Sequence, residues 1–406
     1  MCSGARAAPR STACRIAWRP GRRSTSATTG AFPSGELVQA SNGKLYGMNR
    51  AGGASGGGVI FEFDLSGFVF TKKIDLVNNT TIGGAPFGSM IQASNGKFYG
   101  LTSNGGIAGG GVLYEYDVSG NAYTKKVDLN GALNGSQPNG SLVYASNNKL
   151  YGMTLAGGAN NVGTIFEYNK SNLTFTKLFD MATASGSSPY GALVEAPNGK
   201  LYGMTNSGGV NGVGVIFEYD INGTYTKKID LTSANGCNPF GSLVLGSNGK
   251  FYGLTRAGGS SNLGVIFEYD YVNNLYTKKV DFNNSNGSNP NGSMVLASNG
   301  KLYGVTQLGG GSFIGVLFEY DFVNNVYTKK VDFAATSGSQ PYGSLVQAAN
   351  GKLYGLTRLG GANNVGVVFE YDIVNNTYTK TIDLSTSNGS LPQGSLVKAA
   401  NNKLYG

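Results

Sequence analysis

Residues 242–255 read Ser-Leu-Val-Leu-Gly-Ser-Asn-Gly-Lys-Phe-Tyr-Gly-Leu-Thr, two apolar runs joined by a short polar segment. The joint carries Asn248 followed by Gly249. Asn-Gly between two β-prone runs is a strong hairpin signal, because a tight hairpin turn needs positive φ at both central residues. We therefore expect residues 242–245 and 251–255 to pair as antiparallel strands, with both Asn248 and Gly249 at positive φ.

The segment that follows supplies two more strands. A glycine-rich connection, 257–264, leads into the apolar run 265–270, and a polar turn separates that run from the strand-like residues 276–281. In this second hairpin we expect Glu268 to lie across from one of the lysines of the fourth strand. Such a pair, if exposed, contributes only a few tenths of a kcal/mol.

The whole four-strand unit is copied along the chain. The third strand occurs seven times, and an eighth copy of the first hairpin, 394–406, follows the last complete unit. A fixed period over the whole body indicates one supersecondary unit repeated in series. The dipeptide Tyr-Gly marks the copies at intervals of 50 to 53 residues, with its tyrosines at Tyr46, Tyr99, Tyr151, Tyr202, Tyr252, Tyr303, Tyr354 and Tyr405.

Four antiparallel strands in about 50 residues are typical of a propeller blade, and the kelch type has this period. We predict an all-β fold, a β-propeller of about seven four-stranded antiparallel, kelch-like blades over residues 33–391. A β-solenoid is the competing architecture, but its coils are shorter and lack Asn-Gly hairpins. Residues 392–406 are predicted to be the first hairpin of an incomplete eighth repeat. That hairpin either helps to close the ring or marks a fragment of a longer protein, and the abrupt end at Tyr405-Gly406 favours a fragment.

Residues 1–32 do not resemble the repeats, and we expect a disordered or spurious leader. Residues 1–34 hold six arginines and no acid. Removing these six from the 31 basic residues leaves 25 against 22 acidic ones, so the net charge of +9 does not indicate nucleic-acid binding. Arginines interrupt each candidate signal-peptide segment. No apolar run approaches the ~18 residues of a membrane-spanning helix.

The repeat resembles the Gloeobacter/Verrucomicrobia repeat family. The resemblance rests on the pattern Gly-Ser-Leu-Val-x-Ala-Ser-Asn-Gly-Lys-Leu-Tyr-Gly-Met-Thr, then Gly-Gly, then Gly-Val-Ile-Phe-Glu-Tyr-Asp, and it covers residues 33–406. It implies a secreted or cell-surface bacterial protein, so an extracellular or cell-surface location is expected. It implies no particular biochemical activity.

Residues that usually carry chemistry are scarce. The chain has no histidine, and its three cysteines, Cys2, Cys14 and Cys237, form no disulfide or zinc pattern. Glycine runs such as 56–58 and 309–311 are not followed by Lys-Ser or Lys-Thr, so they are strand connections and not phosphate loops. We predict no catalytic residue, no resident cofactor and no metal-binding residue.

A repeated aspartate at the end of each fourth strand allows two interpretations. A ring of carboxylates could bind Ca²⁺ with loop oxygens as further ligands. Alternatively, each side chain accepts a hydrogen bond from the backbone of the next loop, and we favour this second interpretation. The residues are Asp75, Asp128, Asp180, Asp230, Asp281, Asp332 and Asp383.

Function in a ring of copies is expected where the copies differ. One variable position follows the second strand, and symmetry places its seven copies on one face. If blade seven closes against blade one, four of them form a continuous basic arc, which we predict binds an anionic ligand. The alternative is drift at exposed loop positions. The predicted ligand-face residues are Arg50, Ser103, Leu155, Asn206, Arg256, Gln307 and Arg358, and the arc is Arg256, Gln307, Arg358 and Arg50.

The sequence favours a non-catalytic, monomeric binding module for carbohydrate or protein. The expected partner is an anionic glycan or a surface protein, with no nucleic acid and no membrane span. The alternative is a propeller enzyme that acts on polysaccharide, a lyase or hydrolase without histidine catalysis, and a structural spacer is a third class. A pocket with two close non-repeat acids or a Tyr–Arg pair would favour the enzyme, whereas a flat polar face would favour binding.

Overall fold

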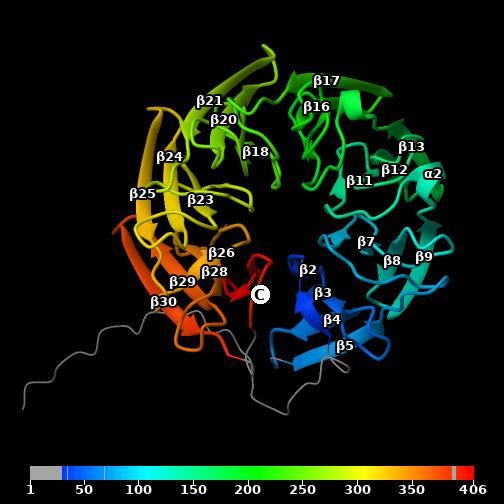
Figure 1. Cartoon of the computed structure of the whole chain (residues 1–406). Coiled ribbons are helices and arrows are strands. Elements are labelled where there is room, and N and C mark those ends of the chain that lie inside the picture. The colour runs from blue at the N-terminus through cyan, green and yellow to red at the C-terminus, as the bar shows by residue number, and fades with distance from the viewer. Residues whose placement is uncertain (1–29, 34, 68, 386–389) are drawn as a thin grey trace, which may run out of the picture.

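Seven four-stranded antiparallel sheets stand like blades around a central axis in the computed structural model, which describes residues 30–33, 35–67, 69–385 and 390–406 (Figure 1). In each blade the strands follow chain order from the axis outward. The predicted all-β, seven-bladed propeller is confirmed. The described helical segments are the short α2 (Gly131–Asn134) and a 3-10 turn at Thr183–Ser185, and neither has the length or apolarity to span a membrane.

Each blade runs from a two-residue inner strand to a seven-residue outer strand. Two blades gain a fifth strand, β1 (Ala31–Pro33) beside β3 and β26 (Ser339–Pro341) beside β28. The strands are β2 (Val38–Gln39), β3 (Leu45–Ala51), β4 (Val59–Asp64) and β5 (Val69–Asp75); β6 (Ile91–Gln92), β7 (Phe98–Thr102), β8 (Val112–Asp117) and β9 (Ala122–Asp128); β10 (Val143–Tyr144), β11 (Leu150–Thr154), β12 (Thr164–Asn169) and β13 (Thr174–Asp180); β14 (Val194–Glu195), β15 (Leu201–Thr205), β16 (Val215–Asp220) and β17 (Thr224–Asp230); β18 (Val244–Leu245), β19 (Phe251–Thr255), β20 (Val265–Asp270) and β21 (Leu275–Asp281); β22 (Val295–Leu296), β23 (Leu302–Thr306), β24 (Val316–Asp321) and β25 (Val326–Asp332); β27 (Val346–Gln347), β28 (Leu353–Leu359), β29 (Val367–Asp372) and β30 (Thr377–Asp383); and the eighth hairpin, β31 (Val397–Lys398) and β32 (Leu404–Tyr405).

The Asn-Gly hairpin forms as predicted, but with a different turn. The N–H of Gly249 donates to the carbonyl of Gly246, and the N–H of Gly246 donates to the carbonyl of Lys250. Gly249 has a φ of 75°, whereas Asn248 is not at positive φ. The expectation of positive φ at both residues was therefore wrong, because the loop is a longer turn with one glycine in the left-handed region. Asn248 instead accepts the N–H of Lys250 and donates to Tyr252 Oη.

The glycine of the Tyr-Gly marker makes room for an aromatic ring. A Cβ on Gly253 would lie 2.3 Å from Cζ of Phe267, which is its partner across β19 and β20. The same glycine recurs opposite an aromatic residue of the third strand in each of the seven blades. The marker is thus a packing requirement of the blade, since any larger residue would collide with the ring.

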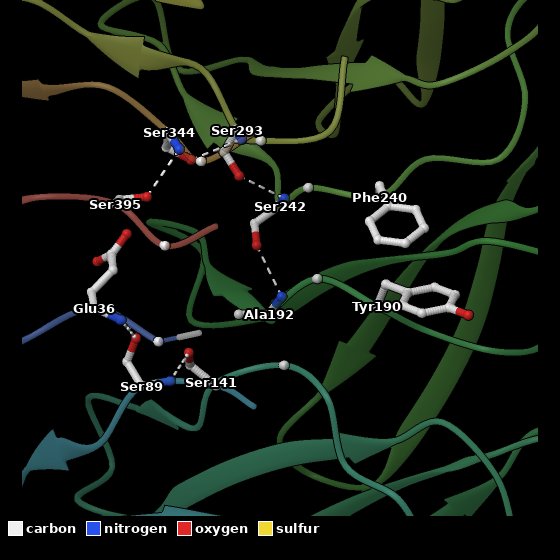
Figure 2. A pocket seen from close by; sticks show the side chains of 18 of the residues that line it. Glu36, Ser89, Ser141, Tyr190, Ala192, Phe240, Ser242, Ser293, Ser344 and Ser395 are labelled. Atoms are coloured by element: carbon white, nitrogen blue, oxygen red, sulfur yellow. Dashed lines mark hydrogen bonds between the residues drawn. The ribbon is translucent and has the colours of Figure 1, made fainter. Parts of the chain in front are cut away.

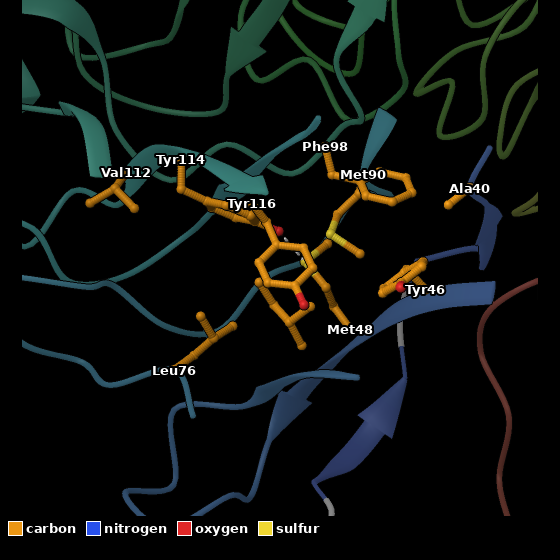
Figure 3. Packing of buried hydrophobic residues seen from close by; sticks show 10 residues of the cluster. Ala40, Tyr46, Met48, Leu76, Met90, Phe98, Val112, Tyr114 and Tyr116 are labelled. Atoms are coloured by element: carbon orange, nitrogen blue, oxygen red, sulfur yellow. Dashed lines mark hydrogen bonds between the residues drawn. The ribbon is translucent and has the colours of Figure 1, made fainter. Parts of the chain in front are cut away.

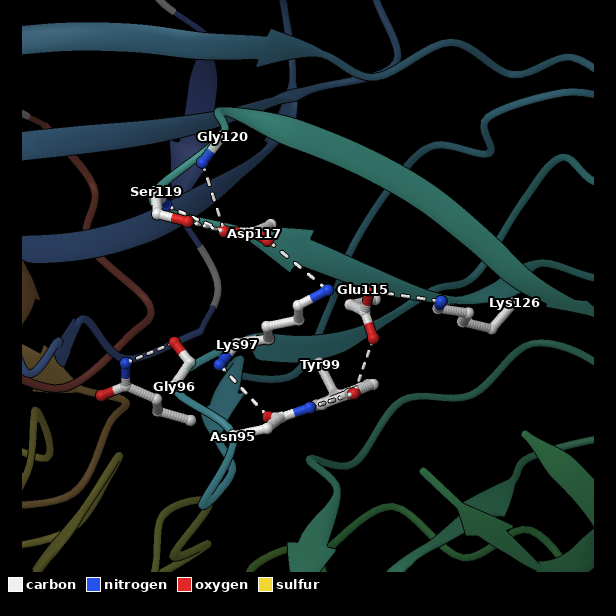
Figure 4. A network of polar contacts seen from close by, with 10 residues as sticks. Asn95, Gly96, Lys97, Tyr99, Glu115, Asp117, Ser119, Gly120 and Lys126 are labelled. Atoms are coloured by element: carbon white, nitrogen blue, oxygen red, sulfur yellow. Dashed lines mark hydrogen bonds and ion pairs between the residues drawn. The ribbon is translucent and has the colours of Figure 1, made fainter. Parts of the chain in front are cut away.

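The glutamate of the third strand is buried, so the small energy of an exposed pair does not apply to it. In blade two, Glu115 is 6 % exposed and accepts a hydrogen bond from Tyr99 Oη at 2.6 Å (Figure 4). Lys97 and Lys126 approach the same carboxylate at 3.0 and 3.2 Å. Its cross-strand neighbour is Thr124, so the prediction of a lysine directly opposite was wrong. A register shift in the outer hairpin of every blade changes the pairing.

Apolar side chains from neighbouring blades pack face to face. Between blades one and two, Tyr46, Met48, Phe98, Tyr114 and Tyr116 are each at most 5 % exposed (Figure 3). The rings of Tyr46 and Phe98 lie 5.2 Å apart, centroid to centroid. Full burial of one such side chain contributes about 1.5–3 kcal/mol, so the interfaces between blades carry most of the apolar stabilisation.

The eighth hairpin fills an eighth position in the ring, between blades seven and one (Figure 1). Leu404 packs in one cluster with Tyr354 of blade seven. Tyr405 packs against blade one, with its ring centroid 5.6 Å from that of Phe63. The hairpin therefore helps to close the ring, one of the two roles predicted for it. The prediction for the leader falls largely on residues 1–29, which lie outside the described residues.

Candidate functional site: the mouth of the central channel

Two of the 22 acidic residues fall outside the repeated positions. Seven glutamates stand in the third strands, six aspartates end those strands, and seven aspartates end the fourth strands. The remaining two are Glu36 and Glu195. Glu195 accepts the N–H and the hydroxyl of Ser146, at 2.9 and 2.5 Å, in the hairpin turn of the neighbouring blade. Glu36 lies at the central axis (Figure 2).

Glu36 occupies a place that serine holds in six of the eight copies. At this place the backbone N–H of one copy donates to the serine hydroxyl of the next, in six bonds of 2.7–2.9 Å (Figure 2). A glycine before each serine allows the close approach, since a Cβ on Gly241 would lie 2.7 Å from the carbonyl oxygen of Gly292. We call this set the axial ring: Glu36, Ser89, Ser141, Ala192, Ser242, Ser293, Ser344 and Ser395.

The carboxylate of Glu36 points into the channel. Its backbone N–H donates to Ser89 Oγ at 2.7 Å, so the axial ring is maintained although the side chain differs. Glu36 is exposed to solvent in the channel, although protein atoms around the channel partly desolvate its carboxylate. This desolvation raises the pKa of Glu36 above its ordinary value, and a hydrogen bond with the side chain of Ser395 offsets part of the rise.

A cavity of about 290 Å³ lies at the axial ring and is lined by residues from all eight positions. The residue before each glycine of the ring is aromatic in four copies and an amide in three. The rings of Tyr190 and Phe240 stack on each other, with centroids 4.4 Å apart and planes inclined by 17° (Figure 2). The aromatic residues are Phe87, Tyr190, Phe240 and Tyr342, and the amides are Asn139, Asn291 and Gln393.

Asn291 is the most buried amide of this lining. Its side chain is 6 % exposed, and its Nδ2 donates to Oε1 of Gln307 at 2.8 Å. Its Oδ1 is shielded from solvent and has no hydrogen-bond partner among the described residues. A buried acceptor without a donor costs about 1–3 kcal/mol.

The predicted ligand-face residues surround the cavity lining. The guanidinium of Arg50 lies 4.7 Å from the ring centroid of Phe87, and that of Arg256 lies 5.6 Å from that of Phe240. Such cation–π contacts at exposed sites contribute about 0.5–1 kcal/mol each. Arg358 is half-buried, and its Nε is shielded from solvent without a hydrogen-bond partner among the described residues.

The neutral members of the predicted face have structural partners. Ser103 donates to the carbonyl of Pro138 at 2.8 Å, and Asn206 donates to the carbonyl of Pro239 at 3.2 Å. Gln307 accepts from Asn291, as described above, and Leu155 is half-buried. These contacts tie the second strands to the loops that enter the channel mouth, whereas Arg50 and Arg256 are exposed.

The predicted continuous arc is interrupted. It requires direct closure of blade seven against blade one, but the eighth hairpin lies between them. Arg358 and Arg50 therefore stand on blades separated by one position of the ring. The interruption arises because the inner hairpin alone buries enough apolar surface, through Leu404 and Tyr405, to occupy a blade position.

The repeated aspartates hydrogen-bond to backbone, as favoured. Asp281 accepts the N–H of Ser260 at 2.8 Å and pairs with Lys278 at 2.9 Å, and each of the other six makes the equivalent backbone bond. The loop is the one before the third strand of the same blade, whereas the next loop along the chain was expected. No cluster of three or more metal-ligating His, Cys, Asp or Glu side chains occurs in the part of the chain that the structure describes. Cys237 is buried with a free thiol.

Sequence reasoning missed Glu36 and the aromatic and amide lining. Both could be found by aligning the eight copies, because the residue before Gly-Ser varies strongly and Glu36 replaces a serine. An enzyme pocket was expected to contain two close non-repeat acids or a Tyr–Arg pair. The described lining contains one non-repeat acid, Glu36, while Glu195 is bound to Ser146.

A ring of near-identical blades around a small cavity at the axis defines the chain as a β-propeller with a candidate ligand channel. The Gloeobacter/Verrucomicrobia repeat matches residues 74–246 and 230–406. The chain belongs to this repeat family, as the sequence pattern indicated. No curated protein sequence matches the chain.

Solved structures with a similar fold are distant in sequence. A proposed 6-phosphogluconolactonase from Bacteroides uniformis is 16% identical with a TM-score of 0.50, and covers 73% of this chain and 83% of its own. One from Bacteroides fragilis is 17% identical with a TM-score of 0.49, over 73% and 82%. TolB from Acinetobacter baumannii is 13% identical with a TM-score of 0.40, over 84% and 77%. At these identities the likeness concerns the fold alone.

Proposed function

We propose that this protein is a non-catalytic, secreted or cell-surface binding module. Its ligand is an acidic glycan or another carboxylate-bearing partner, which docks at the mouth of the central channel. The blades are a repeated scaffold, and the residues that depart from the repeat gather at this mouth.

Arg358 is the observation that carries the proposal. Its Nε–H group is shielded from solvent and lacks an acceptor among the described residues. The guanidinium stays charged at any physiological pH, so the missing acceptor has a free-energy cost. Arg358 is only half-buried, so a ligand carboxylate could pair with the accessible part of its guanidinium and offset this cost. Arg50 and Arg256 add two exposed guanidinium groups around the same mouth.

The second candidate is a propeller enzyme that acts on polysaccharide. Glu36 favours it, since a carboxyl with a raised pKa suits proton transfer. Glycoside hydrolysis ordinarily uses two carboxyl groups that flank the bond, and the described lining offers one. Binding is therefore the function we propose first.

A glycan array enriched in uronic acids and sialic acids tests the proposal. The wild-type chain is compared with the double variant Arg256→Ala and Arg358→Ala, and with Lys398→Ala, which removes one exposed positive charge from β31. We expect an acidic glycan to bind, the double variant to lose at least tenfold in affinity, and Lys398→Ala to retain it. Absence of acidic-glycan binding, or unchanged binding by the double variant, would contradict the proposal.

A further inference from the structure

The axial ring carries a carboxylate at one position, Glu36. Six members of the ring are serines and one is alanine, so Glu36 is its only charged side chain. Glu36 is also the only charged residue among those that line the cavity. Among the described residues it forms no ion pair, although the channel mouth carries arginines at its outer edge. The interior of the cavity is therefore acidic, in contrast to its rim.

We propose that this cavity is a binding subsite for a ligand that bears a primary ammonium group, of the amino-sugar class, with the ammonium paired to the carboxylate of Glu36. The proposal goes beyond the acidic ligand proposed for the arginines at the channel mouth. It places a positively charged ligand group deeper in the same channel, at Glu36.

The polar groups of the cavity fit a ligand rich in hydrogen-bond donors. The carboxylate of Glu36 is an acceptor at the cavity, and the side-chain amides of Asn139 and Gln393 add further acceptors to the lining. An ammonium supplies three donors, and sugar hydroxyls supply more. Because Glu36 is exposed to the channel, a ligand ammonium can reach its carboxylate directly, and the pair would offset the partial desolvation that raises the pKa of Glu36.

The apolar groups of the cavity fit the faces of a sugar ring. Tyr190, Phe240 and Tyr342 line it alongside the amides Asn139 and Asn291. Aromatic faces accept both C–H groups and cations, and amides hydrogen-bond hydroxyls. The volume of about 290 Å³ lies near the lower end of the range of about 300–1,000 Å³ for small-molecule sites. One sugar unit, or the end of a chain, suits this size better than a polymer.

Isothermal titration of the full chain with glucosamine tests the subsite, and glucose serves as the neutral comparison. Glu36→Ser introduces the residue that six other copies carry, so the variant is expected to fold. The matched control is Glu195→Gln, which neutralises the other non-repeat acid. We expect glucosamine to bind at least tenfold more tightly than glucose. We also expect Glu36→Ser to lose at least tenfold in glucosamine affinity, and Glu195→Gln to stay within twofold of wild type.

Three results would overturn the proposal: no binding of glucosamine at millimolar concentration, equal affinity for glucose, or unchanged affinity in Glu36→Ser. Failure of this subsite can be distinguished from failure of the proposed acidic-glycan site at the arginines of the channel mouth. Loss of acidic-glycan binding in the Arg256→Ala and Arg358→Ala variant should leave glucosamine affinity intact, because neither arginine lines the cavity. A parallel loss of both would refute two independent subsites.

Discussion

The buried tyrosine–glutamate bond of each blade should contribute measurably to stability, and Tyr99→Phe isolates it. Tyr99 is fully buried and donates to Glu115 at 2.6 Å (Figure 4). A hydrogen bond to a charged group contributes about 1.5–3 kcal/mol. Glu115 keeps its two lysine partners in the variant, so we expect a loss near the lower end of that range, about 2 kcal/mol.

The eighth hairpin provides a matched control. Tyr405 is also buried and accepts a hydrogen bond from Asn401 at 3.0 Å, as Tyr99 does from Asn95 at 3.0 Å. Among the described residues Tyr405 donates to no glutamate, because its hairpin has no third strand in this chain. Tyr405→Phe should therefore cost less than about 0.5 kcal/mol, since the exposed Asn401 can turn to water.

Urea unfolding followed by circular dichroism measures both variants. The double-mutant cycle of Tyr99→Phe with Glu115→Gln isolates the pair from any change in packing. We expect a coupling energy of about 1 kcal/mol or more. Equal losses for Tyr99→Phe and Tyr405→Phe, or a coupling energy near zero, would refute the reasoning.

Three further perturbations test the scaffold. Burial alone would raise the pKa of Glu115, but hydrogen bonds from tyrosine and lysine lower it below its ordinary value. The ionised Glu115 therefore stabilises the fold fully above the unfolded pKa of about 4.3, and this stabilisation is lost as pH falls through the lower folded pKa. The urea midpoint should drop below about pH 4, and a flat pH profile would contradict this. Gly253→Ala should cost about 1–3 kcal/mol in urea unfolding, because its Cβ would meet the ring of Phe267 at 2.3 Å; Gly249→Asn is the control and should be near neutral, since two other copies carry asparagine at that turn position with φ of 60–63°. EDTA should leave the melting temperature unchanged, because the repeated aspartates, such as Asp281, already bond to a backbone N–H and a lysine. A fall in melting temperature that Ca²⁺ reverses would support the calcium interpretation instead.

The blade could be predicted from local signals alone. The hairpin at Asn248-Gly249, the third strand at 265–270 and the period of the repeat each have a short-range physical cause. The hairpin and the third strand are confirmed, although the first strand of the hairpin is shorter than predicted, Val244–Leu245 in place of 242–245. What failed were statements that depend on side-chain geometry. Glu268 lies opposite Thr277 in the register that the turn after Asp270 sets, and a register shift follows between Ile266 and Phe267; no local pattern marks either feature.

The candidate site was harder to predict because it forms only when the ring is closed. Residues about 50 positions apart meet at the axis, as Ser242 and Ser293 do through a 2.8 Å bond. No single repeat contains that contact. The arginine positions could be found by symmetry, but their stacking on Phe87 and Phe240 depends on how the loops enter the channel. Glu36 was overlooked since, within its own repeat, one acid in place of serine carries no signal.

The central claim is that ligands bind where the copies differ, at the mouth of the channel. Crystals of the full chain soaked in glucosamine and, separately, in glucuronic acid test it most directly. We predict difference density for glucosamine against Glu36 inside the cavity, and for glucuronate against Arg358 at the rim. Density for both confined to the opposite face, where the hairpin turns and Glu195 lie, would contradict the claim, as would empty cavities at saturating ligand.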